Sequence, residues 1–200
     1  MSGNGDTVNI FLSGVGGQGT ILASNILAEV LLQAGYDVKK SEVHGMAQRG
    51  GDVTTHFRYG SKVYSPLIME GEVDFLVSFE LLEGLRYVNW LKPQGRVLLN
   101  NFRILPPGVN LGNVEYPDAI GETFRKHFKD SVWIVNGHDI ARELGNVQVA
   151  NVVLIGALSV FFPFLEASQW VGALKGLLPA GLHAINIRAF EEGRNAVGAR

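Results

Sequence analysis

The stretch VNIFLSGVGGQGTILASNILAEVLLQA, residues 8–34, decides the fold of this chain. Residues 8–13 predict a buried strand because they are almost continuously apolar. Residues 14–19 are a glycine-rich turn, and residues 20–34 repeat apolar side chains at helical spacing. A second strand is predicted at residues 37–43. Because a strand, a helix and a strand in this order are typical of a parallel unit, we expect a parallel α/β sheet.

The rest of the chain predicts more strands and helices around this unit. Residues 53–59 alternate, a turn follows at Gly60, and residues 62–65 run back, which predicts a hairpin and therefore a mixed sheet. Further strands are expected at 73–79, 95–100, 114–116 and 132–135, and helices at 81–91, 117–128, 138–144, 148–162, 167–178 and 182–195. The expected fold is one domain over residues 1–200, a three-layer α/β/α sandwich with a mostly parallel, mixed sheet and a helical C-terminal part.

The amino-acid composition excludes several classes of function and indicates a protein partner. The 200 residues contain 17 basic and 19 acidic side chains, so nothing draws the protein onto nucleic acid or an anionic membrane. Absence of cysteine excludes disulfides, a thiol nucleophile and an iron–sulfur cluster held by this chain, and it fits a cytoplasmic location. Charged residues are 18%, below the usual quarter or so, which suggests that a partner covers part of the surface. We expect neither an export signal nor a membrane span, because residues 149–165 are short and interrupted.

The glycine loop is the first candidate site. Gly14, Gly16 and Gly19 fit G-x-G-x-x-G between a strand and a helix, where backbone N–H groups can meet an anion. A dinucleotide site is one interpretation, with Glu42 as its acidic residue. Gln18 stands where such sites usually have a small or apolar residue, so a structural turn, a docking surface or another phosphate-bearing ligand stay open. Thr20 and Ile21 replace the Lys–Ser/Thr pair, which excludes a nucleotide-hydrolysing P-loop.

The second candidate is the loop SEVHGMAQRGG, residues 41–51. It follows the second strand, so we expect it at the same carboxyl edge as the glycine loop. Arg49 is a fork-shaped donor for phosphate or carboxylate, His44 could move a proton, and Gln48 could bind a polar ligand. The alternatives are a structural histidine and a salt-bridged arginine.

No catalytic constellation or metal-ligand spacing is evident, so His44 is the only catalytic candidate and no metal site is expected. Glu80 and Glu83 are interpreted as caps at a helix start.

The two loops together resemble the gamma-type domain of 2-oxoacid:ferredoxin oxidoreductases. FLSGVGGQG, residues 11–19, and SEVHGMAQRGG carry the resemblance at this spacing. Other similar stretches extend it over nearly the whole chain, at residues 64–66, 73–80, 83–87, 95–100, 151–158 and 186–193.

The resemblance implies a division of labour. The complex decarboxylates a 2-oxoacid, here indolepyruvate or another arylpyruvate, on thiamine diphosphate with Mg²⁺. Electrons pass through iron–sulfur clusters to ferredoxin, and the acyl group passes to coenzyme A. The thiamine and clusters belong to a large partner chain, and this small subunit is expected to hold no cofactor and to be inactive alone.

In this interpretation the two loops line the edge that faces the large subunit and the entrance for coenzyme A or the oxoacid. Arg49 would contact a phosphate or carboxylate. A stand-alone NAD- or flavin-binding oxidoreductase and a purely structural assembly subunit remain as alternatives. The loop residues are Gly14, Gly16, Gly17, Gln18, Gly19, His44, Gly45, Gln48, Arg49, Gly50 and Gly51.

Overall fold

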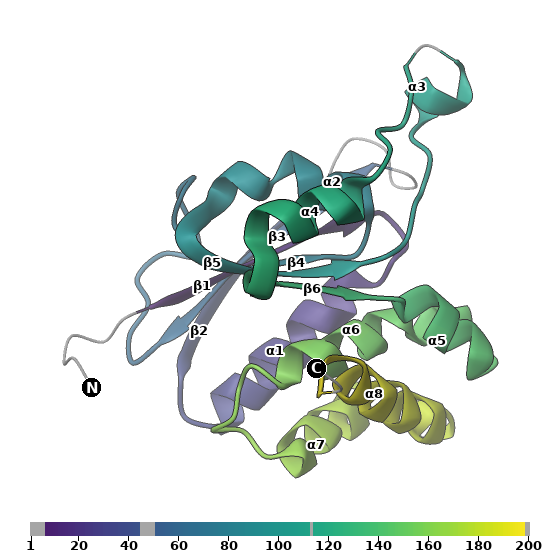
Figure 1. The fold of residues 1–200 in the computed structure, drawn as a ribbon. Helices are drawn as coiled ribbons and strands as arrows, with labels where there is room; N and C mark the ends of the chain where they lie inside the picture. Colours follow the sequence, from purple (N-terminus) through teal and green to yellow (C-terminus); the bar gives the residue numbers. More distant parts are fainter. Residues whose placement is uncertain (1–6, 45–50, 113, 199–200) are drawn as a thin grey trace.

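A computed structural model describes residues 7–44, 51–112 and 114–198, and there it shows the expected sandwich (Figure 1). Within these residues one sheet has the strand order β2-β3-β1-β4-β5-β6. The strands are β1 (Val8–Val15), β2 (Asp37–His44), β3 (Asp52–Gly60), β4 (Val73–Ser78), β5 (Leu91–Asn100) and β6 (Val132–Val135). The pairs β1–β4, β4–β5 and β5–β6 are parallel, and β3 is antiparallel to both β1 and β2. The mixed, mostly parallel sheet is therefore confirmed.

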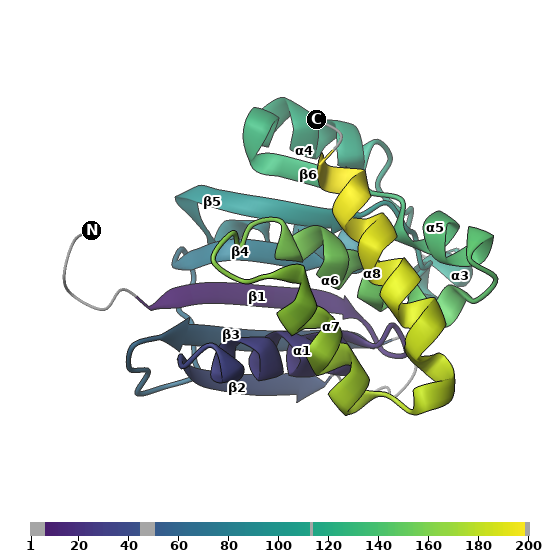
Figure 2. The same ribbon diagram turned by 90° about the horizontal axis from the view of Figure 1, so that it is seen from below.

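Helices cover both faces of the sheet. Figure 2 shows α1, α6, α7 and α8 over one face, and Figure 1 shows α2 and α4 over the other. The helices are α1 (Thr20–Gln33), α2 (Leu81–Arg86), α3 (Pro107–Asn110), α4 (Ile120–Phe128), α5 (Gly137–Glu143), α6 (Ala150–Ser159), α7 (Ala167–Leu177) and α8 (His183–Gly198). The expected helical C-terminal part is thus present.

The main core lies between the sheet and the C-terminal helices. Helix α6 is mostly apolar and is buried from its second residue on, because α8 covers the side that faces away from the sheet. Gly156 on α6 and Gly193 on α8 permit this close crossing. A Cβ on Gly156 would overlap the backbone of Phe190, and one on Gly193 would overlap the backbone of Val153. The expected apolar helix is therefore a core element.

The predicted hairpin over residues 53–65 is wrong. No strand follows β3 before β4, and β3 instead lies between β1 and β2. β1 and β2 run in the same direction, as the strand–helix–strand pattern predicts, but they are not neighbours. Arg58 explains the turn, since its guanidinium donates to the carbonyl oxygens of Ser65 and Leu67 at 3.0 and 3.1 Å. That side chain, rather than a strand ladder, holds the returning segment.

Several other predicted elements also differ from the structure; the largest differences are a missing strand and two helix boundaries. Residues 114–116 form no strand within the described chain, because Tyr116 turns its ring inward and donates its hydroxyl to Glu80 at 2.6 Å. The helix predicted over 81–91 ends at Arg86, and a 3-10 turn, Val88–Trp90, leads directly into β5. The helix predicted from residue 117 begins at Ile120, after Ala119 adopts a φ of 54°.

Candidate functional site

The carboxyl ends of β1 and β4 form a topological switch point. β1 continues through α1 on one face of the sheet, whereas β4 continues through α2 on the other (Figure 1). Open α/β sheets bind ligands at such a point because the diverging loops leave a crevice. A pocket of about 310 Å³ lies there. It is lined by Gly16, Gly17, Gln18, Phe79, Asn100, Phe102, Ile104, His138, Val147, Gln148, Ala150 and Asn151.

Gln18 joins the two strands at the switch point. Its Oε1 accepts the backbone N–H of Val15 at 2.7 Å, and its Nε2 donates to the carbonyl of Phe79 at 2.8 Å. A Cβ on Gly14 would lie 2.9 Å from this Oε1, so the glycine makes room for the amide. The polar side chain that looked unusual for a dinucleotide loop is therefore a structural bridge.

Two buried asparagines complete the edge. Asn151 donates to the carbonyl of Gly19 at 3.2 Å, across 132 positions of sequence. Gly19 has a φ of 75° and meets the Asn151 amide so closely that a Cβ would collide with it. Asn100 donates to Phe79 at 3.0 Å and accepts from the N–H of Gly137 at 3.0 Å. Neither asparagine is among the site residues predicted from sequence, although an asparagine inside an apolar helical run is a usable signal.

The start of α1 at this edge suits an anion. Its N-cap residue, Gly19, makes no side-chain cap, and the first turn holds no acidic residue. Unpaired N–H groups and the helix dipole favour a phosphate or a carboxylate at such an end.

Glu42 does not support the dinucleotide interpretation. Its Oε1 accepts from Lys40 at 2.6 Å and from Ser24 at 3.2 Å, so the carboxylate is already engaged. β3 also separates β2 from β1, which puts Glu42 one strand farther from the glycine loop than a ribose contact requires.

The second loop leaves and enters the sheet beside the glycine loop. Gly14 and His44 both pair with Val53, from opposite sides of β3, and the N–H of Gly16 donates to Gly51 at 2.9 Å. The expected meeting of the two loops at one edge is confirmed at these backbone positions. The predictions for Gly45, Gln48, Arg49 and Gly50, and for the side chain of His44, lie outside the described residues.

Glu80 caps α2 and also anchors the segment that follows β5. Its carboxylate accepts from the N–H of Glu83 at 2.9 Å, from the hydroxyl of Tyr116 at 2.6 Å and from the N–H of Ile104 at 3.1 Å. The capping interpretation of Glu80 is confirmed. Burial and the neighbouring carboxylate raise the pKa of Tyr116, so its hydroxyl stays a donor.

Two histidines near the sheet make identifiable structural contacts. Burial lowers the pKa of His56, whose Nδ1 accepts the N–H of Ile68 at 3.1 Å. His138 stacks on Phe102 at a centroid distance of 4.1 Å along the pocket wall.

Among the described residues no three His, Asp or Glu side chains come close enough to hold a metal ion. None of the described helices has the length and apolar character that crossing a membrane requires.

Comparison with known proteins identifies the family. The family model described as pyruvate ferredoxin/flavodoxin oxidoreductase matches residues 9–196. The chain belongs to the pyruvate ferredoxin/flavodoxin oxidoreductase family. The indolepyruvate oxidoreductase subunit IorB of Thermococcus kodakarensis is 41% identical, over 94% of this chain and 95% of that relative. The same subunit of Pyrococcus horikoshii is 40% identical over the same shares.

The solved structure of a relative has the same fold as this chain. The gamma subunit of a keto/oxoacid ferredoxin oxidoreductase from Geobacter sulfurreducens superposes with a TM-score of 0.71 at 24% identity. The match covers 96% of this chain and 99% of that chain. The resemblance indicated by the two glycine loops is thus confirmed for the family and for the α/β fold.

Proposed function

We propose that this chain is the small subunit of an indolepyruvate, or related 2-oxoacid, ferredoxin oxidoreductase. The observation that carries the proposal is the similarity to proteins named indolepyruvate oxidoreductase subunit, 41% identical over 94% of this chain. Near-complete coverage of both chains makes a shared role the simplest explanation. We propose that the chain acts as one domain in the cytoplasm.

The redox groups in this proposal belong to the partner chain. The sequence has no cysteine to ligate an iron–sulfur cluster, and the described residues gather no acidic or histidine set for Mg²⁺ and thiamine diphosphate. The described residues therefore do not fit those groups. Its contribution is to enclose the site, orient the substrate and exclude water, while ferredoxin receives the electrons through the complex.

The glycine edge, formed by residues 14–19 between β1 and α1, is the part of the surface that would face the substrate. The uncapped start of α1 offers backbone N–H groups to the carboxylate of an oxoacid or to a phosphate of coenzyme A. Gln18 and Asn151 hold this edge rigid, because each bridges the loop to another element. A preformed edge orients a ligand without first having to be ordered.

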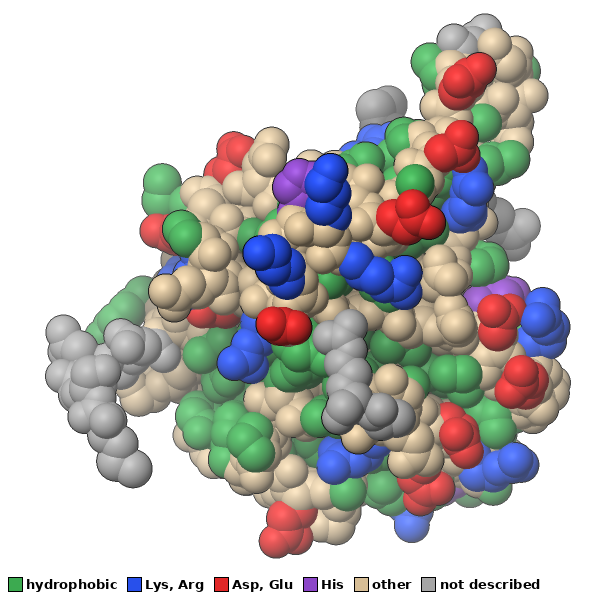
Figure 3. Space-filling model, viewed as in Figure 1, with side chains coloured by type: hydrophobic (Ala, Val, Ile, Leu, Met, Phe, Trp, Pro, Cys, Tyr) green, Lys and Arg blue, Asp and Glu red, His purple; other side chains and the backbone are tan. Residues whose placement is uncertain are grey.

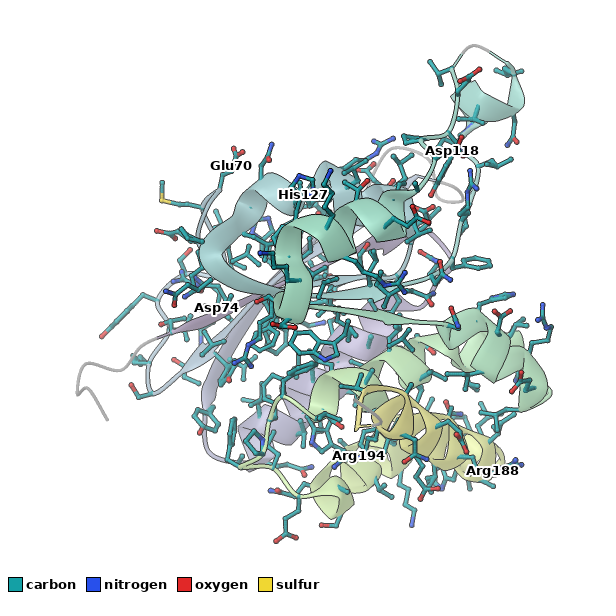
Figure 4. All side chains as sticks on the ribbon, in the orientation of Figure 1. Glu70, Asp74, Asp118, His127, Arg188 and Arg194 are labelled. Atoms are coloured by element: carbon teal, nitrogen blue, oxygen red, sulfur yellow. The ribbon has the colours of Figure 1, made fainter. Side chains whose placement is uncertain are left out.

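An exposed arm is the candidate docking element. Between Ile104 and Tyr116, both held to the body by Glu80, the chain projects outward and carries α3 at the tip (Figure 1). Leu105, Leu111 and Val114 on this arm are 47%, 75% and 60% exposed. Asp118, labelled in Figure 4, lies where the arm returns. Apolar side chains gathered on a projection are typical of a surface that a partner covers.

The deciding experiment is anaerobic dye reduction driven by indolepyruvate and coenzyme A. We expect activity when this chain is mixed with the large thiamine-binding chain, and none with either chain alone. A panel of 2-oxoacids on the same preparation then gives the substrate. No activity with any oxoacid, despite a fully loaded large chain, would contradict the proposal. Tight NADH or flavin binding by this chain alone would favour the stand-alone alternative.

A further inference from the structure

A second, smaller pocket lies beside the base of the arm. It measures about 180 Å³ and opens between the end of β1, the start of β3, α2 and the segment that leads into α3. Its lining is Val15, Gly51, Asp52, Glu83, Arg86, Ile104, Pro106 and Pro107. Val15 and Gly51 also border the glycine edge, so this pocket adjoins the surface expected to face a partner.

Glu83 is the unusual group in this pocket. It is 5% exposed, and its Oε1 lies 3.3 Å from Nε of Arg86. Its other oxygen, Oε2, is buried without any hydrogen-bond partner. A buried carboxylate oxygen without a donor is costly, and native structures seldom keep one without a reason. The capping interpretation of Glu83 therefore does not account for its carboxylate, because Glu80 provides the α2 cap.

The charges around Glu83 are predominantly negative. From α2 it is faced by Glu80 and by the half-exposed Arg86, and from β3 by Asp52. Glu80 is engaged by its own three donors, and Asp52 accepts the hydroxyl of Tyr87 at 3.3 Å. Burial raises the pKa of Glu83 to about 7 against the lowering effect of Arg86, and Glu80 and Asp52 raise it further. Among the described residues, Oε2 of Glu83 thus has no cationic partner.

The other residues that line the pocket indicate what kind of cation would fit it. Val15, Ile104, Pro106 and Pro107 give an apolar lining that suits an aliphatic stem. Lysine and arginine combine such a stem with a charged head that can reach a carboxylate. A free metal ion fits less well, since the described residues offer no third ligand of the required kind here.

We propose that this pocket receives a lysine or arginine side chain of the large partner chain, whose cationic head pairs with Oε2 of Glu83. This proposal rests on the proposed function, which includes that partner chain. We infer a cationic occupant because its charge complements the carboxylate. We infer the subunit interface because the pocket lies beside the arm. Glu83 would then be a specificity contact between the two subunits.

The proposal makes assembly depend on pH in a defined direction. In the free chain the pKa of Glu83 is about 7, so the carboxyl is largely protonated at pH 6. A paired cation favours the ionised form and lowers this pKa, so assembly releases a proton. When the paired cation makes the carboxyl about tenfold more acidic, assembly must tighten as the pH rises from 6 to 8, with the Kd falling by about fivefold through this group.

The experiment measures the Kd between this chain and the large chain from pH 6 to pH 8. Glu83→Gln mimics the protonated form, so it should match wild type within about threefold at pH 6 and bind about tenfold more weakly at pH 8. The matched control is Glu122→Gln, an exposed carboxylate on α4. It should follow the wild-type curve at every pH.

The thermal stability of the isolated chain separates this contact from a folding effect. A carboxyl with a raised folded-state pKa destabilises the fold as the pH rises from about 4.5 to about 7, so Glu83→Gln should raise the Tm at pH 8. A lower Tm there would mean that a cation of this chain already occupies the pocket, which overturns the proposal. A Kd for Glu83→Gln equal to wild type at pH 8 also overturns it. No complex at any pH would instead contradict the proposed function.

Discussion

At the residue scale, the glycine edge depends on amides that satisfy backbone groups. Gln18→Ala would leave the N–H of Val15 without its acceptor and would remove one of two donors to Phe79. We expect the free energy of unfolding to fall by about 1–3 kcal/mol, because a buried N–H loses its partner. Urea denaturation measures this change.

The matched control is Gln33→Ala at the end of α1. Its exposed amide donates to the half-buried Glu29 on the surface of the helix, so the free energy of unfolding should change by less than about 0.5 kcal/mol. Equal losses in the two variants would mean that the Gln18 bridge does not stabilise the edge.

Arg49 remains a prediction from sequence. If its guanidinium contacts a phosphate or carboxylate, Arg49→Ala should raise the concentration of coenzyme A or oxoacid needed for half-maximal rate about tenfold or more. The Tm of the isolated chain should not change. Steady-state kinetics of the assembled complex test this, with Arg142→Ala on α5 as the control, since that side chain pairs only with the exposed Asp139. Unchanged kinetics would remove Arg49 from the substrate edge.

At the element scale, the crossing of α6 and α8 sets the packing of the C-terminal part. Gly193→Ala would push a methyl group into the backbone of Val153, so we expect a loss of about 3 kcal/mol in the free energy of unfolding. Gly172→Ala on α7 is the control, because its Cβ would meet open space. There alanine should stabilise the fold by about 0.5–1 kcal/mol. Opposite signs in urea denaturation are the expected result.

Sequence predicts elements better than it predicts their neighbours. The apolar run of β1 and the periodicity of α1 arise from local residues, and both elements appear where they were expected. The place of β3 between β1 and β2 depends on ladder contacts between distant residues, so a local alternation pattern suggested a different partner.

The same limit applies to the candidate site. The glycines and Gln18 stand out in the sequence, whereas Asn100 and Asn151 act only once distant elements meet. The orphaned oxygen of Glu83 has no sequence signal, since an acidic residue at a helix start is ordinary.

At the scale of the whole molecule, the charged side chains do not point to a single electrostatic partner. Figure 3 shows basic and acidic groups interspersed over one face, and the net charge is −2. Long-range attraction is therefore weak, and recognition must come from local contacts. The arm and the adjoining Glu83 pocket supply an apolar and a polar contact at one edge.

The exposed leucine on the arm tests whether the large chain docks at this edge. Leu111 is 75% exposed beside α3, and burying it against the large chain would contribute about 1.5–2 kcal/mol to assembly. Leu111→Ser should therefore raise the Kd of the complex at least about tenfold. Turnover at saturating subunit concentration and the Tm of the isolated chain should both stay unchanged, because the side chain touches neither the core nor the glycine edge. Leu32→Ser, which alters a 53% exposed leucine at the far end of α1, is the control and should assemble normally. Equal Kd values for the two variants would show that the partner binds elsewhere on the molecule.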